Sequence, residues 1–288
     1  MFDIITDSAC DLTPETAATL NIEIIPFYVS LDGEHYRKEG KEIAVRDFYQ
    51  FMVDNPSAYP KTSLPSLEDF ETAFRAHAEA GRPVLCICFT SKMSGCVGSA
   101  RNARELVLED FPDAKIEVID STAATVTESI VVENAVAMRD AGCTLDEAVT
   151  WLEAEKITNQ IFFTVGNLDY LIKGGRIGKV TGRAANILGI KPSLAVIDGE
   201  LKVVRKYRGS LPICVGKYIT DQLANREDID RSMVFISSTQ AKPGCMEAIK
   251  AGLRQYGNFE NVYETDIGTT IGGYSGPGTI GIVFARKQ

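Results

Sequence analysis

Hydrophobic runs alternate with amphipathic stretches through the first half of the chain. Short runs rich in β-branched and apolar residues, typical of strands, lie at 2–5, 22–29, 84–89 and 115–119. Apolar residues recur at helical spacing over 67–80, 96–110 and 129–141. Strands that alternate with helices favour a mainly parallel sheet with flanking helices, so the first half is predicted to be an α/β domain.

The pattern changes in the second half. Strand-like runs lie at 160–165, 193–197, 200–206, 232–236, 262–266 and 279–285, and helical spacing covers 211–224 and 245–256. Asp198-Gly199 joins two of these runs, and an Asp-Gly dipeptide between β-rich segments is a strong hairpin signal. We therefore expect an α+β domain with a mixed or antiparallel sheet. The domain boundary is placed between segments 1–157 and 158–288.

Composition narrows the classes of function. The 288 residues are 45% hydrophobic, which is enough for two ordinary cores, and the net charge of -9 argues against nucleic-acid binding. No run of about 18 apolar residues occurs, and Asp3 and Asp7 interrupt any signal-peptide core. The sequence thus predicts a cytoplasmic protein without stable membrane insertion. The seven cysteines lack zinc or disulfide spacing and only His35 and His77 are available, so neither a metal site nor a cofactor is expected.

A basic, glycine-rich segment stands out at 164–192. Its cations and glycines are Lys173, Gly174, Gly175, Arg176, Gly178, Lys179 and Arg183. Positive charge concentrated in an acidic protein fits an acidic substrate or partner, and a solvated helix face is the other interpretation. The glycines favour a function, because they cost helix stability unless the backbone approaches something closely.

Hydroxyl and carboxyl side chains follow three of the predicted strands. They are Thr6-Asp7-Ser8, Thr90-Ser91 and Asp120-Ser121. Ligands of open α/β sheets bind outside the carboxyl ends of the strands, so we expect these side chains to meet in one crevice. Helix capping is the alternative for each of them.

Two loops that open helices offer hydroxyl groups to an anion. In the first, Ser66 begins a capping-box pattern, which leaves Thr62 and Ser63 free for another role. In the second, Ser94 and Gly95 precede a long helical pattern, whose N-terminus supplies free N–H groups and a partial positive charge. The two loops predict a carboxylate or phosphate site, with simple capping by Ser94 as the alternative.

Several familiar catalytic motifs do not fit. Gly276, Gly278 and Gly281 form a GxGxxG pattern, but it precedes a final strand rather than a helix. The run 174–180 is one residue short of a P-loop and has Val180 where serine or threonine would contact magnesium. Ser94 lacks the spacing of a nucleophile elbow. We find no self-sufficient catalytic set.

A series of short motifs runs in order along nearly the whole chain. They are Thr6-Asp7-Ser8, Lys61-Thr62-Ser63 with Pro65-Ser66, Ser91-Lys92-Met93-Ser94-Gly95, Asp120-Ser121, Leu171-Ile172-Lys173-Gly174-Gly175-Arg176-Ile177, Lys191-Pro192 and Gly276-Pro277-Gly278. This series resembles the DegV family of bacterial fatty-acid-binding proteins. The resemblance implies a two-domain DegV-like fold with a long-chain fatty acid in a buried tunnel between the domains. It also implies a lipid-binding carrier that is not itself an enzyme and that presents the fatty acid to a separate ATP-binding fatty-acid kinase, which forms the acyl phosphate.

The resemblance assigns roles to single residues. Thr62 and Ser94 match the hydroxyls that hold the fatty-acid carboxylate in the family, and Ser63 and Gly95 lie beside them. Tyr274 stands where kinase-linked members carry histidine. A tyrosine can donate a hydrogen bond to a carboxylate but is neutral near pH 7, so lipid binding tolerates this change more easily than kinase coupling does.

Three arginines match basic positions of the family. Arg176, Arg205 and Arg208 are assigned to docking the kinase and to neutralising charge during phosphoryl transfer, with solvated surface charge as the alternative. Cys96 departs from the family, because many members carry threonine after the Ser-Gly pair. A second function stays open beside the carrier, namely a stand-alone enzyme acting on a small phosphorylated or carboxylated metabolite at the same crevice.

Overall fold

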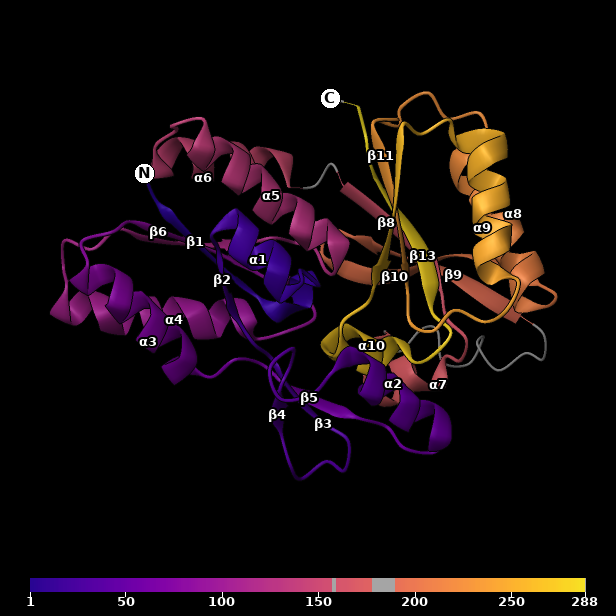
Figure 1. Cartoon of the computed structure of the whole chain (residues 1–288), viewed down its shortest axis with the longest axis horizontal. Helices are drawn as coiled ribbons and strands as arrows, with labels where there is room; N and C mark the ends of the chain where they lie inside the picture. Colours follow the sequence, from indigo (N-terminus) through magenta and orange to yellow (C-terminus); the bar gives the residue numbers. More distant parts are fainter. Residues whose placement is uncertain (157–158, 178–189, 288) are drawn as a thin grey trace.

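A computed structural model of the chain shows two large sheets side by side, with a small third sheet at the bottom of the view (Figure 1). It describes residues 1–156, 159–177 and 190–287. The two large sheets divide the chain on either side of residues 157–158. That the two parts are separate domains, with a boundary at residue 157, stays a prediction.

The first sheet is parallel throughout, as predicted. Its order is β2 (Glu23–Ile25), β1 (Asp3–Asp7), β6 (Val84–Cys88) and β7 (Ile116–Asp120). One face packs against α3 (Leu67–Glu79) and α4 (Cys96–Asp110), and the other against α5 (Val126–Asp140) and α6 (Leu145–Glu155). Every side chain of β6 is buried, because both faces of this sheet are covered.

The single strand predicted at 22–29 is wrong, because Pro26 divides it. A proline has no N–H to donate to a neighbouring strand, and the chain leaves the first sheet at this point. The continuation, β3 (Tyr28–Ser30), pairs instead with β4 (Arg37–Lys38) and β5 (Lys61–Ser63) in the small antiparallel sheet. The Thr62-Ser63 loop of the sequence analysis is therefore an edge strand. It lies near α2 (Val45–Asp54), another element without a clear signal in the sequence (Figure 1).

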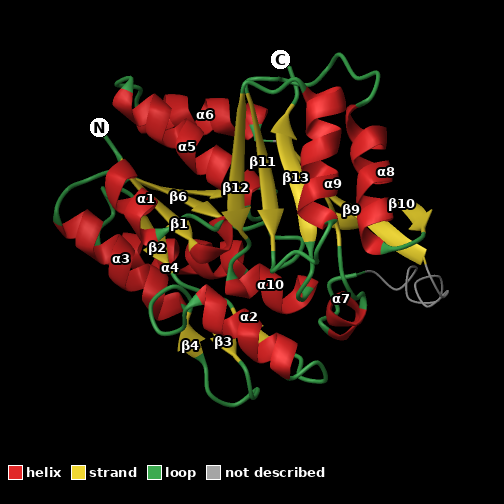
Figure 2. Cartoon of the chain, turned by 45° about the vertical axis from the view of Figure 1, so that its right-hand side comes forward, coloured by secondary structure: helices red, strands yellow, loops and turns green. Residues whose placement is uncertain are grey.

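The second large sheet is mixed, as the sequence predicted. Its order is β10 (Glu200–Arg208), β9 (Ile190–Ile197), β8 (Asn159–Thr164), β13 (Ile280–Ala285), β11 (Met233–Ser238) and β12 (Asn261–Asp266). The hairpin between β9 and β10 turns at Asp198 and Gly199, whose φ angles of 54° and 77° fit a tight Asp-Gly turn. One face packs against α8 (Leu211–Leu223) and α9 (Cys245–Gly252), which are side by side in Figure 2. The predicted helix 245–256 ends as a π-helical turn over Leu253–Gly257.

The other face of the second sheet turns toward the first half of the chain. Ile161 and Val283 pack there against Val126 at the start of α5. The helix α5 thus covers the first sheet with one side and contacts the second sheet with its N-terminal turn. The two sheets consequently meet across apolar side chains rather than through a linker alone.

A short helix, α10 (Thr269–Ser275), ties the two halves together. It contacts α2 and the small sheet, and also α7 (Asp169–Lys173). Its N-terminal end is held by the Glu39 carboxylate, which accepts hydrogen bonds from Thr269 Oγ1 (2.8 Å), Thr270 N (2.8 Å) and Thr270 Oγ1 (2.6 Å). Ser8 Oγ donates to the same carboxylate at 2.6 Å. Residues from both ends of the chain therefore fix the position of α10.

Among the described residues, no helix combines the length and the apolar character that a membrane crossing requires.

Candidate functional site

A cavity of about 240 Å³ lies between the two halves of the chain. Phe27 and Phe89 contribute aromatic walls from the first half, with ring centroids 6.1 Å apart in an edge-to-face arrangement. Ile161, Phe163 and Val196 line it from the second sheet. Apolar atoms make up most of the cavity surface, although many hydroxyl-bearing side chains also line it, so the cavity suits a hydrophobic ligand with a polar end.

The residues predicted to bind a carboxylate all line this cavity: Thr62, Ser63, Ser94 and Tyr274, together with Gly95. The two loops that carry them adjoin, because a β-carbon on Gly95 would lie 3.4 Å from Leu64 Cδ2. The structure therefore brings the predicted anion-binding residues to one place, although the loops are far apart in the sequence.

Thr62 and Tyr274 form a direct pair across the two halves. Thr62 Oγ1 on β5 lies 2.9 Å from Tyr274 OH on α10, and either oxygen can be the donor. The pair uses only one of its two hydroxyl hydrogens, so the other is available to an acceptor in the cavity. A carboxylate oxygen is such an acceptor.

Ser94 acts as a cap for α4, and its binding role stays a prediction that this geometry allows. Its Oγ accepts a hydrogen bond from Cys96 N at 3.2 Å, which satisfies one of the free N–H groups at the start of α4. Its own hydroxyl hydrogen is not used in that bond and can still be donated to a ligand. Gly95, the residue before α4, provides no side-chain cap and leaves the backbone open to the cavity.

Arg176 carries the charge of the site. Among the described residues that line the cavity, it is the one with an ionised side chain. Its guanidinium carbon lies 4.4 Å from the centre of the Tyr274 ring, and Nη1 donates to Gly174 O at 2.7 Å. A β-carbon on Gly174 would overlap the Tyr274 ring, so glycine at this position is what allows the ring to lie beside the arginine.

The other predicted basic residues do not join this cavity. Arg205 and Arg208 are exposed on β10 and line a separate shallow depression together with Lys217 of α8. Arg205 Nη1 lies 3.1 Å from Asp221 Oδ2, so part of its charge is already paired. Lys173 covers the ring of Tyr59 at 3.5 Å. Gly178, Lys179 and Arg183 of the basic segment lie outside the described residues.

The side chains that follow the parallel strands were expected to line a ligand crevice, but Asp7 and Asp120 accept hydrogen bonds from backbone N–H groups instead. Asp7 accepts hydrogen bonds from Ala9 N and Phe89 N, and Asp120 Oδ1 accepts from Ser91 N and Thr122 N. They organise the turns at the carboxyl edge of the first sheet and do not line the cavity, which is a correction to the expected crevice. The turns they hold nevertheless lead directly to Phe89 and Ser94.

Two further polar residues line the cavity without a signal in the sequence. Thr125 and Ser275 are buried, and in the described structure neither hydroxyl has a hydrogen-bond partner. Thr125 has a φ of 55°, which is unusual for a β-branched residue. Thr125 precedes α5 and Ser275 ends α10, so two segments far apart in the sequence bring them to the cavity, which no local pattern predicts.

The chain is similar over its whole length to known proteins. The family model described as "Uncharacterised protein, DegV family" matches residues 1–287. A DegV domain-containing protein of Streptococcus pyogenes serotype M1 is 33% identical over 98% of this chain and 96% of its own length. A crystal structure described as a "fat acid (stearic acid)-binding protein" from Eubacterium ventriosum is 37% identical, with a TM-score of 0.85 over 100% of this chain and 99% of that one. A structure from Thermus thermophilus, described as fatty acid binding of a DegV family protein, is 26% identical, with a TM-score of 0.83 and 99% coverage of both chains.

Proposed function

The chain belongs to the DegV family, and from this premise we propose that it is a cytoplasmic carrier of a long-chain fatty acid. In this proposal the carboxylate is bound by Thr62, Ser94 and Tyr274, with Ser63 and Gly95 beside them. The acyl chain fills the apolar cavity between the two sheets. The similar structures from Eubacterium ventriosum and Thermus thermophilus, both described as binding fatty acid, support the choice of ligand.

The observation that carries the proposal is the composition of the cavity lining. It combines a cluster of hydroxyl groups with a mostly hydrocarbon surface, which is the pattern that an amphipathic ligand requires. Burying about 15 methylene groups at about 0.8 kcal/mol each gives on the order of 12 kcal/mol before the costs of association. Each neutral hydrogen bond adds only about 1 kcal/mol. The acyl chain therefore sets the affinity, and the hydroxyl groups set the orientation of the ligand.

The carrier is further proposed to present the carboxylate to a separate ATP-dependent kinase. The exposed Arg176 beside Tyr274 would neutralise charge that develops on the phosphoryl group. Arg205 and Arg208 lie apart from the cavity and would serve as a docking surface for the kinase. In this proposal the carrier positions the fatty-acid carboxylate and contributes the charge of Arg176, and the kinase binds the ATP.

Lipid bound during expression tests the carrier proposal. The full chain is purified without added lipid, its native and denatured masses are compared, and the bound material is extracted into organic solvent. One long-chain fatty acid per chain is the expected result. A protein that is empty and stays empty when offered fatty acids would overturn the proposal and favour an enzyme acting on a small phosphorylated or carboxylated metabolite.

Presentation to a kinase needs its own test. The loaded protein is mixed with ATP and a bacterial fatty-acid kinase, and acyl phosphate is trapped with hydroxylamine. Product is expected only when both proteins are present, and Arg176→Met is expected to lose it while keeping its lipid. Arg254→Met, which changes an exposed arginine outside the cavity lining, is the matched control. Equal product from both variants would contradict the role of Arg176.

A further inference from the structure

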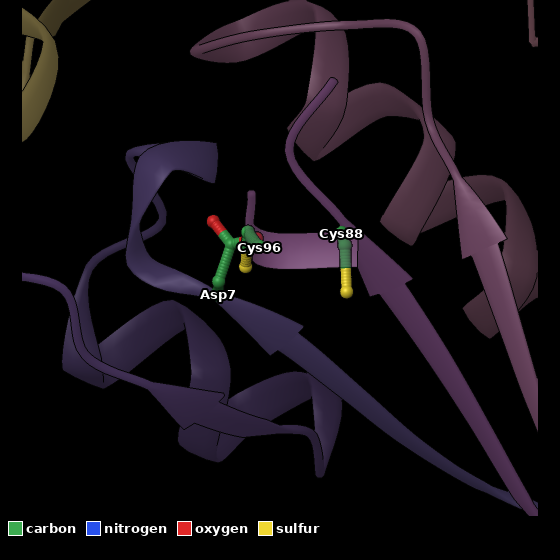
Figure 3. A group of neighbouring side chains, drawn as sticks. All are labelled: Asp7, Cys88 and Cys96. Atoms are coloured by element: carbon green, nitrogen blue, oxygen red, sulfur yellow. The ribbon is translucent and has the colours of Figure 1, made fainter. Parts of the chain in front are cut away.

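Three potential metal ligands converge in the core of the first half, away from the lipid cavity lining. Asp7 ends β1, Cys88 ends the neighbouring strand β6, and Cys96 begins α4, as Figure 3 shows. Each offers one ligand atom, and these atoms all lie within 4.8 Å of one another. All three side chains are 0% exposed. Spacing along the chain gives no hint of this group, because the fold alone brings the three positions together.

The donor set matches a thiophilic divalent cation. Zinc accepts both thiolate sulfur and carboxylate oxygen as ligands, whereas calcium and magnesium prefer oxygen ligands alone. Ligand atoms around a tetrahedral zinc ion lie roughly 3.5 to 4 Å apart, given metal–ligand bonds of about 2.0 to 2.3 Å. Cys96 Sγ lies 3.2 Å from Asp7 Oδ2, so a small outward movement makes room for an ion. Cys86 Sγ, 3.6 Å from Cys88 Sγ, places a further thiol next to the group.

A buried acidic side chain without a hydrogen-bond partner in the described structure also lies in this part of the core. Glu128 is completely buried, and in the described part of the chain neither of its carboxylate oxygens has a hydrogen-bond partner. Among the described residues, no lysine or arginine forms an ion pair with Asp7 or Glu128. Buried polar groups without a hydrogen-bond partner are costly, and a cation bound nearby would offset part of that cost.

Hydrogen bonding already occupies part of Asp7, but it leaves room for a metal bond. The carboxylate accepts from Ala9 N at 3.0 Å, from Phe89 N at 2.7 Å and from the Cys96 thiol at 3.2 Å. Metal binding would replace only the last of these, since Cys96 would release its proton and become a ligand. The two backbone hydrogen bonds would stay, and they would orient the carboxylate in the way that outer-shell partners orient metal ligands.

We propose that Asp7, Cys88 and Cys96 together bind a thiophilic divalent cation of the Zn²⁺ class. The ion would fasten the first residue of α4 to the ends of β1 and β6. Because Ser94 and Gly95 immediately precede that residue, the ion would also stiffen the turn that lines the lipid cavity. The site is structural in this proposal, since its ligands are fully buried.

The test measures metal in the full chain, loaded during expression because the site is closed in the folded protein. Protein from zinc-supplemented medium is dialysed exhaustively, and its metal content is measured by mass spectrometry of the elements. Protein from cobalt-supplemented medium is examined for thiolate-to-cobalt charge-transfer absorption in the near ultraviolet. About one ion per chain and a clear charge-transfer band are expected. Wild-type protein with neither metal nor band would overturn the proposal.

Variants separate this site from other thiols. Cys96→Thr replaces the thiol by a hydroxyl that can still donate to Asp7. The double variant Cys88→Ser/Cys96→Thr is expected to contain at least tenfold less metal per chain than the wild type. Cys245→Ser removes another completely buried cysteine, in α9, and is expected to keep it. Circular dichroism and lipid content check that the variants fold. If a folded double variant retains the wild-type metal content, the proposal is wrong, and if it does not fold, the cobalt spectrum of the wild type decides.

Discussion

The Thr62–Tyr274 pair allows the carboxylate site to be tested apart from the acyl-chain site. Thr62→Val removes one hydroxyl and changes the side-chain volume very little. The lost bond is to a charged acceptor if a fatty-acid carboxylate is bound, and such bonds contribute about 2 kcal/mol, equivalent to about 30-fold in Kd. For a fatty alcohol the same change removes a neutral bond, which corresponds to about 1 kcal/mol, or about fivefold. Tyr274→Phe is expected to behave in the same way.

The assay is displacement of a fluorescent fatty acid from delipidated protein by acids and alcohols of several chain lengths. Shortening the chain by two methylenes should weaken binding by about 1.6 kcal/mol in the wild type and in both variants, since the acyl chain contacts are unchanged. The variants should shift the whole acid series by a constant amount. Thr19→Val, an exposed helical threonine remote from the cavity lining, is the matched control.

Two results would refute the reasoning. An unchanged Kd for fatty acids in Thr62→Val would mean that this hydroxyl does not meet the carboxylate. An equal loss for acids and alcohols would mean that the substitution disturbs the cavity wall rather than the head-group contact. The double variant adds a further check, because two hydroxyls that act on one ligand group should lose less together than the sum of the single changes.

Three further predictions concern the supports of the site. Gly174→Ala should push the Tyr274 ring out of place and weaken fatty-acid binding to the level of Tyr274→Phe, and unchanged affinity in the displacement assay would contradict the packing argument. Glu39→Gln should lower the free energy of unfolding by about 2 to 3 kcal/mol, because an amide nitrogen replaces an oxygen that accepts a hydrogen bond from Thr270. Urea denaturation measures this change. A decrease below about 0.5 kcal/mol would contradict the prediction. Glu128 should remain protonated in the folded chain but ionise above its ordinary pKa of 4.5 when the chain is unfolded, so the unfolding free energy should fall as pH rises above about 4.5, by up to about 1.4 kcal/mol per unit. Glu128→Met should flatten this dependence in urea titrations at several pH values, and an identical slope would show that another group is responsible.

Local signals in the sequence predicted much of the secondary structure. The Asp-Gly turn was enough to predict the hairpin of the second sheet, because both positions favour left-handed backbone angles. Ser66 and Asp69 form the capping box that their spacing predicts at the start of α3. These features depend on neighbours within a few residues, so a single sequence contains the information needed for them.

Elements held by distant contacts were not predictable in this way. The α10 helix contains adjacent glycines and threonines, which are poor helix formers, and it depends on Glu39 from the other half of the chain. The hydroxyls of Thr62 and Ser94 were predicted as a binding site from their loops, but the contact of Thr62 with Tyr274 depends on the packing of α10 against the small sheet. The binding roles of these residues stay predictions until the lipid experiments are done.

The cavity has one wall from each half of the chain, and this has a kinetic consequence. A ligand that lies between Phe89 on one side and Phe163 on the other contacts both halves of the chain at once. Any movement that parts the halves would remove contacts from both sides of the ligand at once, so the residence time of a bound lipid would depend on how often the halves open. Exchange of the lipid with membranes would then be slow for the carrier alone, and a partner protein that separates the halves would promote release of the lipid.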